Sequence, residues 1–269
     1  MIEALIALVF GLLIGSFLNV CIHRWPRDLS VVRPRSRCPV CETPIAAWDN
    51  IPLLSYLLLR GRCRKCHSRI SPRYPIVELA TAAFFFYFVH SLGVTATAIK
   101  MCCFSAMLIA LIFTDLEERI LPDEFTIGGV VLGFVFAAFV PVPDITGAAL
   151  FWLMGIEPSG RWTSLIESLV GATLPAVFLW GGGWLYYKIR HREGLGFGDV
   201  KLIAMVGSFL GLRGALITLI VGSIAGSILG YGYIKVTRKD PSTYELPFGT
   251  FLGAAALLAA ILSGSWVLS

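Results

Sequence analysis

The sequence predicts an all-α membrane protein, a polytopic bundle of about eight transmembrane helices with one small soluble insert. Hydrophobic residues make up 57% of the 269 positions and charged residues only 14%. The mean hydropathy is +0.78. Ordinary soluble domains are about 45–50% apolar and about 25% charged, so the composition argues against a water-soluble globule. It also excludes a disordered chain, which would need low hydrophobicity and high charge.

Eight apolar stretches are candidates to cross the bilayer, which takes roughly 17–25 residues of helix. They are residues 2–20, 76–92, 99–114, 125–142, 165–187, 200–212, 215–236 and 248–268. The sixth stretch is short, and its boundary with the seventh falls at residues 211–214, where we expect a tight turn.

Basic residues predict the orientation of these spans. Of the 22 Lys and Arg, 19 lie in four connecting stretches, residues 21–75, 115–124, 188–201 and 235–247. Short loops rich in Lys and Arg stay in the cytoplasm, which predicts that all four face it. Glu3 precedes the first apolar run and Arg24 follows it, the reverse of a cleaved signal peptide. We therefore expect a retained first helix and an external N-terminus.

The one sizeable soluble segment contains two CxxC pairs, Cys38/Cys41 and Cys63/Cys66, with 21 residues between them. Four thiolates at such spacing favour a structural zinc ion. About 50 residues cannot bury much core, so a metal staple is physically sensible there. Three alternatives stay open: disulfides, a redox dithiol, and covalent haem attachment at the CxxCH that ends in His67.

We expect three regions: a first transmembrane helix at 1–22, a cytoplasmic tetracysteine zinc domain at 23–75, and a membrane domain at 76–269.

Two carboxylates stand at the edges of predicted spans, where charges are costly and usually functional. Asp115 ends the third span, and Asp199 opens the sixth in the sequence Gly196-Phe197-Gly198-Asp199. Both lie at the predicted cytoplasmic face, so they can meet and share a proton as acid and base. Gly196 and Gly198 would let a substrate backbone approach. Helix capping and a proton or cation transport site are the alternatives, although transport sites usually lie near the bilayer midplane.

These motifs, in this order, resemble the type 4 prepilin peptidase family, the bifunctional leader peptidases and N-methyltransferases of type IV pilus and type II secretion systems. The similarity covers nearly the whole length. Its fragments are Gly15-Ser16-Phe17-Leu18-Asn19-Val20 with Arg24 and Pro26, the two CxxC pairs around Trp48-Asp49-Asn50-Ile51-Pro52, Ser55-Tyr56, Arg73-Tyr74-Pro75 with Glu78-Leu79, Asp115, Leu121-Pro122-Asp123, the GxGD at Gly196–Asp199 with Lys201, and Pro247-Phe248-Gly249.

The resemblance implies a GxGD-type aspartyl protease of the bacterial inner membrane. Asp115 and Asp199 match its catalytic aspartates, and Asp123 is expected to shape the site. Such enzymes cut prepilin or pseudopilin leaders after a Gly at the cytoplasmic face. They then methylate the new N-terminus, commonly Phe, with S-adenosylmethionine, although the residues that bind this donor cannot be assigned from the sequence.

We expect prepilins and membrane lipid as partners. No nucleic acid is expected, because membrane orientation and anionic lipid already account for the basic loop. A leader peptidase without methyltransferase activity and a proton-coupled transporter are the alternative functions.

Overall fold

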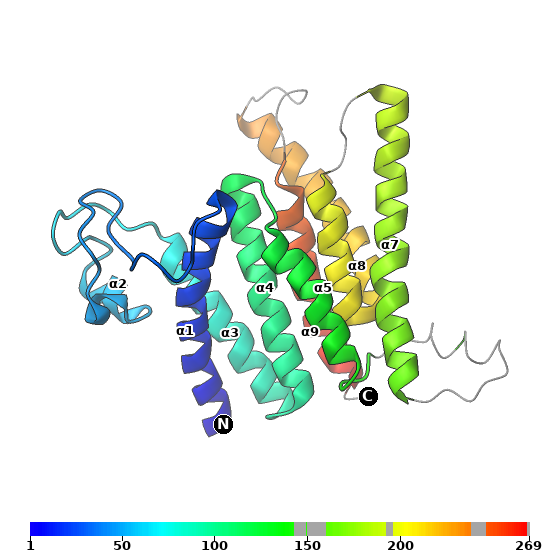
Figure 1. Ribbon diagram of the computed structural model, residues 1–269, viewed down its shortest axis with the longest axis horizontal. Coiled ribbons are helices and arrows are strands. Elements are labelled where there is room, and N and C mark those ends of the chain that lie inside the picture. The colour runs from blue at the N-terminus through cyan, green and yellow to red at the C-terminus, as the bar shows by residue number, and fades with distance from the viewer. Residues whose placement is uncertain (143–148, 150–159, 192–195, 238–245, 268–269) are drawn as a thin grey trace. The chain divides into compact units, whose positions relative to one another are not determined.

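The computed structural model describes residues 1–142, 149, 160–191, 196–237 and 246–267, and their regular elements are helices. The α-helices are α1 (Ile2–Arg24), α2 (Leu54–Leu58), α3 (Arg73–Leu92), α4 (Ala96–Glu118), α5 (Asp123–Ala137), α7 (Gly160–Arg190), α8 (Phe197–Thr237) and α9 (Phe248–Val267). Two short 3-10 helices, Trp25–Arg27 and Ala47–Asn50, complete the described elements (Figure 1). The all-α class is confirmed.

Five of these helices, α1, α3, α4, α7 and α8, are long and apolar enough to cross a membrane, which confirms a multi-pass protein. The longest, α8, is two helices joined at Gly211, where φ is 74° and ψ is −173°. Gly211 therefore separates the predicted sixth and seventh spans. Two more predicted spans correspond to α5, which ends at Ala137, and to α9. Residue 268, where the last prediction ended, lies outside the described residues.

The chain divides into two compact units, Met1–Phe113 and Thr114–Ser269. In the first unit, α1 packs closely against α3 because Gly11 and Gly15 present no side chain. A Cβ at either position would lie 2.6 Å from a Cα atom of α3. One α3 residue also holds the soluble segment, since the Glu78 carboxylate accepts a hydrogen bond of 2.8 Å from the Leu53 N–H. The cysteine segment is thus anchored to a membrane helix.

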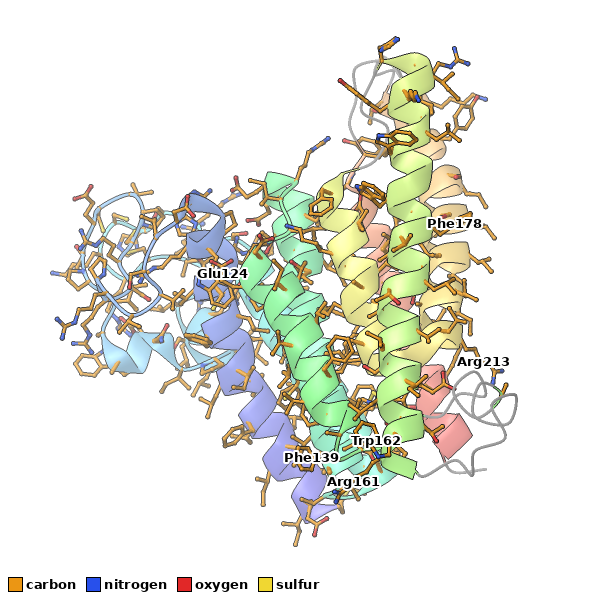
Figure 2. The ribbon with its side chains drawn as sticks, turned by 45° about the vertical axis from the view of Figure 1, so that its right-hand side comes forward. Glu124, Phe139, Arg161, Trp162, Phe178 and Arg213 are labelled. Carbon is orange, nitrogen blue, oxygen red and sulfur yellow. The ribbon has the colours of Figure 1, made fainter. Side chains whose placement is uncertain are left out.

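The second unit consists of α5, α7, α8, α9 and the end of α4. Its tightest contact joins α7 to α8, where a Cβ at Gly207 would lie 1.8 Å from the Gly171 carbonyl oxygen. Only glycine can occupy this crossing. Figure 2 places Arg161 and Arg213 toward one end of the unit and Glu124 toward the other. The ends of this unit therefore differ in the charged residues they present.

Candidate active site and metal centre

Two buried carboxylates lie together in the second unit. Asp115 is in the last turn of α4 and is 5% exposed, and Asp199 is in the first turn of α8 and is 8% exposed. The two side chains are close enough for their charges to interact, although they are 84 positions apart in sequence. Helix packing thus brings together the two residues that the sequence singled out.

Thr250, in the first turn of α9, donates two hydrogen bonds to Asp115. Its backbone N–H lies 2.6 Å and its hydroxyl oxygen 2.8 Å from the Asp115 Oδ2 atom. First-turn N–H groups lack intrahelical acceptors, and the helix N-terminus carries partial positive charge. The side chain of Asp199, by contrast, accepts from the Gly196 N–H. Hydrogen bonding therefore favours the charged form of Asp115 over that of Asp199.

The pair is enclosed by small residues and one leucine. A Cβ at Gly249 would lie 3.1 Å from the Asp115 Cγ atom and 3.0 Å from the Leu121 Cδ1 atom. A Cβ at Gly198 would lie 3.1 Å from that same Leu121 atom. Leu121 thus contacts the beginnings of both α8 and α9, and the two glycines allow these approaches.

The remaining residues expected to shape the site lie beside it. A Cβ at Gly196 would be 3.4 Å from the Asp199 Oδ2 atom. Asp123, at the start of α5, forms an ion pair with Lys201 of α8. This ion pair joins the first turn of α5 to the beginning of α8. Asp123 therefore helps to position these two helices. Among the described contacts, none links its side chain to Asp199.

The four predicted cysteines form a single cluster in the first unit. Their sulfur atoms all lie within 4.8 Å of one another. The Cys38–Cys66 separation is 3.7 Å and the Cys41–Cys63 separation is 4.0 Å. Zinc in a tetrahedron of thiolates, with bonds of about 2.3 Å, requires sulfur separations of about 3.8 Å. The donor set and its dimensions therefore fit zinc.

Each CxxC pair belongs to one copy of a repeated turn. Residues 37–45 and 62–70 share the pattern Arg-Cys-x-x-Cys-x-x-x-Ile. In each copy the N–H of the first Cys bonds to a carbonyl five residues later, and the residue after the second Cys has positive φ. These residues, Glu42 and His67, have φ values of 53° and 56°. His67 is thus the turn residue of its copy, which explains its position without haem.

Local hydrogen bonds prepare two of the thiols for metal binding. The Cys41 backbone N–H holds the pKa of Cys38 down to about 6. The Ser68 hydroxyl, 3.1 Å from the sulfur of Cys66, lowers the pKa of that thiol. Because metals bind the thiolate, a lowered pKa assists ligation near neutral pH.

Sequence reasoning missed two features of these sites. Thr250 was overlooked, although it directly follows Pro247-Phe248-Gly249. The repeat of residues 37–45 in 62–70 was also missed, although the shared Arg and Ile positions make it visible in the sequence.

Two family models match the chain in succession. The bacterial peptidase A24 N-terminal domain matches residues 9–92, and the type IV leader peptidase family matches residues 102–231. The chain therefore belongs to the type IV leader peptidase family.

Similar curated proteins bear one name, prepilin leader peptidase/N-methyltransferase. The protein of Stutzerimonas stutzeri is 34% identical, over 96% of this chain and 90% of its own length. That of Aeromonas hydrophila is also 34% identical with the same coverage. That of Myxococcus xanthus is 38% identical over 89% of this chain and 66% of its own length. No solved structure matches the chain.

Proposed function

We propose that this protein removes the leader peptide from prepilins or pseudopilins with Asp115 and Asp199, and then methylates the new N-terminus. Leader cleavage and N-methylation follow from the family and from the relatives that share nearly the whole chain. The observation that carries the mechanism is the meeting of two buried carboxylates at the ends of two membrane helices. A transporter is not favoured, because the relatives are named as peptidases and methyltransferases.

The unequal environments of the two aspartates assign their roles. Thr250 donates twice to Asp115, so Asp115 is the ionised member and takes a proton from the attacking water. Asp199 is the protonated member and donates to the carbonyl oxygen of the scissile bond. As the C–N bond breaks, Asp115 passes its proton to the leaving nitrogen and Asp199 recovers a proton from a hydroxyl of the tetrahedral intermediate. The products are the leader's carboxyl group and the amine of the mature pilin, and the pair returns to its starting state. This is the shared-proton chemistry of an aspartate pair.

Cleavage exposes the primary amine that methylation requires. S-adenosylmethionine is the methyl donor that the activity implies. It would supply one methyl group to that amine, with S-adenosylhomocysteine and a proton as the other products.

We propose that the four cysteines hold a structural zinc ion. Their sulfur separations match a tetrahedral zinc site. Thiolate ligands suit zinc, and two pairs account for all four donors. The ion would staple a segment that lacks a hydrophobic core of its own.

We place the active site at the cytoplasmic face of the bacterial inner membrane. Of the 22 basic residues, 19 lie in the four stretches assigned to the cytoplasm. Two of the other three, Arg161 and Arg213, lie toward the end of the second unit away from Glu124. Substrate leaders and membrane helices meet at that cytoplasmic face.

Asp115→Asn and Asp199→Asn test the proposal. Each change should slow leader removal from a prepilin by roughly 10²–10⁴-fold, the usual contribution of a positioned acid or base. Protein yield in the membrane fraction should stay unchanged. Asp28→Asn is the matched control, because Asp28 is an exposed aspartate in the other unit. Cleavage at the wild-type rate by either dyad variant would overturn the assignment.

A further inference from the structure

A group of large apolar side chains is exposed on the cysteine segment. Leu57 and Leu58 of α2 are 70% and 73% exposed, and Trp48 is 68% exposed. Leu54 is half exposed at the start of the same helix. Exposed apolar groups gathered in this way mark an interaction surface. Leucine and tryptophan are typical of surfaces that rest in the boundary between lipid headgroups and acyl chains.

The position of α2 brings this surface to the level of the membrane. In Figures 1 and 2, α2 lies beside the length of α1 and not beyond its C-terminal end. Both elements belong to the first unit. Since α1 is one of the helices apolar enough to span the bilayer, a membrane crossed by α1 would reach the apolar side chains of α2.

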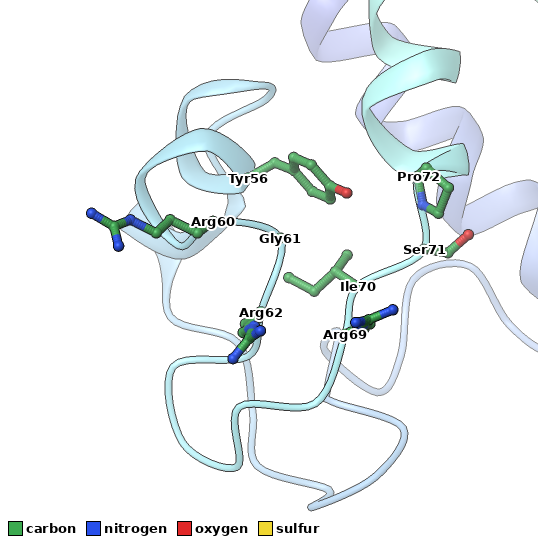
Figure 3. Close-up of a pocket in the computed structure, with 8 residues that line it drawn as sticks. All are labelled: Tyr56, Arg60, Gly61, Arg62, Arg69, Ile70, Ser71 and Pro72. Atoms are coloured by element: carbon green, nitrogen blue, oxygen red, sulfur yellow. The ribbon is translucent and has the colours of Figure 1, made fainter.

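A basic cavity lies next to α2. It has a volume of about 500 Å³ and is lined by Tyr56, Arg60, Gly61, Arg62, Arg69, Ile70, Ser71 and Pro72 (Figure 3). Arg60 points away from the other lining side chains in this view. The cavity ends at Pro72, directly before the membrane helix α3 begins at Arg73. It therefore opens where the chain enters the membrane.

Two arginines of the cavity are held opposite each other. Arg62 and Arg69 form an isolated antiparallel β-bridge, which sets their side chains as direct neighbours. Neither has an acidic partner in the described part of the chain. Like charges placed opposite each other are unfavourable unless an anion lies between them. The first repeat shows the contrast, because there the equivalent bridge pairs Arg37 with Pro44.

We propose that the cysteine domain rests on the cytoplasmic leaflet through the leucines of α2 and binds the phosphate of an anionic phospholipid between Arg62 and Arg69. The guanidinium groups neutralise the phosphate and donate hydrogen bonds to its oxygens. Ser71 and Tyr56 also line the cavity. The apolar surface and the basic cavity then face one occupant, the membrane that α1 and α3 already cross. The proposal concerns lipid and does not depend on the chemistry of the aspartate pair.

Lipid retention by the purified full chain tests this site. The protein is titrated with phosphatidylglycerol in detergent, and bound lipid is counted by native mass spectrometry. Arg62→Gln/Arg69→Gln should weaken phosphatidylglycerol binding by about 10- to 30-fold, since each basic residue near an anionic membrane contributes roughly a fivefold step. Arg37→Gln, in the other repeat, is the matched control and should bind as the wild type does. Zinc content, equal in all three proteins, shows that the cysteine domain has kept its fold.

Two outcomes would overturn the proposal. One is that the double variant binds phosphatidylglycerol as tightly as the wild type does, or no more weakly than Arg37→Gln does. The other is displacement of the lipid from the wild type by excess inorganic phosphate, which would make the cavity a site for a free anion. Retention of phosphatidylglycerol against phosphate, together with its loss in the double variant alone, supports a lipid site.

Discussion

The cysteine cluster and the aspartate pair are built in different ways. The four cysteines come from two short turns, each closed by its own backbone hydrogen bonds. Asp115 and Asp199 come from separate helices and meet only because the end of α4 and the first turns of α8 and α9 come together in the second unit. The cysteine site is thus built from local turns, whereas the aspartate site needs the helix bundle. A substitution that disrupts one site should therefore leave the structure of the other site intact.

Removal of two metal ligands should have the largest effect, and it should disrupt the cysteine site while leaving the aspartate site intact. Cys38→Ser/Cys41→Ser removes two of four ligands, and structural zinc contributes about 10–16 kcal/mol to the folding of small zinc domains. We expect loss of zinc from the purified protein and rapid proteolysis within residues 36–71, with no new cleavage in residues 160–191. Metal analysis and limited proteolysis measure both. Cys103→Ser, a cysteine outside the cluster, is the control. An unchanged zinc-to-protein ratio in the double variant would end the zinc proposal.

Thr250→Val should affect only the aspartate site. The change removes the hydroxyl that donates to Asp115 but keeps the backbone N–H and the branched shape. A hydrogen bond to a charged group contributes about 1.5–3 kcal/mol, so leader removal should slow by about 10- to 100-fold. Thr250→Ser should restore most of the rate. Equal rates for the Val and Ser variants would show that the hydroxyl does not hold Asp115.

Gly249→Ala tests how closely α9 must approach Asp115. The added methyl group would lie 3.0–3.2 Å from atoms of Leu121 and Asp115, so these side chains must shift by a few tenths of an ångström. Such overpacking destabilises by about 1–3 kcal/mol, and leader removal should fall with it. Gly128→Ala is the control, because its methyl group would meet no atom within 4 Å. If Gly249→Ala and Gly128→Ala have the same melting temperature and the same rate of leader removal, the close approach of α9 to Asp115 has no role.

Asp49→Asn should have the smallest effect, confined to the cysteine domain. Hydrogen bonds from the Arg64 guanidinium, 2.6–3.1 Å long, hold the pKa of Asp49 below its usual range. The pair therefore stabilises the domain above the unfolded-state pKa of Asp49 and stops doing so as pH falls through the lowered value. Arg64 is largely exposed, so the loss is slight. Melting curves at neutral and acid pH measure it, and a difference that persists in acid would contradict this origin.

The contrast between the two sites also explains what the sequence could predict. The cysteine cluster followed from spacing, because two short turns determine the positions of their own ligands. The apolar runs predicted the spans, with the break at Gly211 in the expected place. Thr250 could not be found in this way, since its contact with Asp115 joins residues 135 positions apart and depends on helix packing. The opposed Arg62 and Arg69 likewise required the bridge that the structure shows.

The most direct test of the central claim is the intact mass of a prepilin after incubation with the purified protein, with and without S-adenosylmethionine. We predict a product without its leader in both reactions, and one added methyl group only when S-adenosylmethionine is present. Asp199→Asn should leave the prepilin at its original mass in both. Leader loss with Asp199→Asn at the wild-type rate, or an intact leader after incubation with the wild type, would contradict the account.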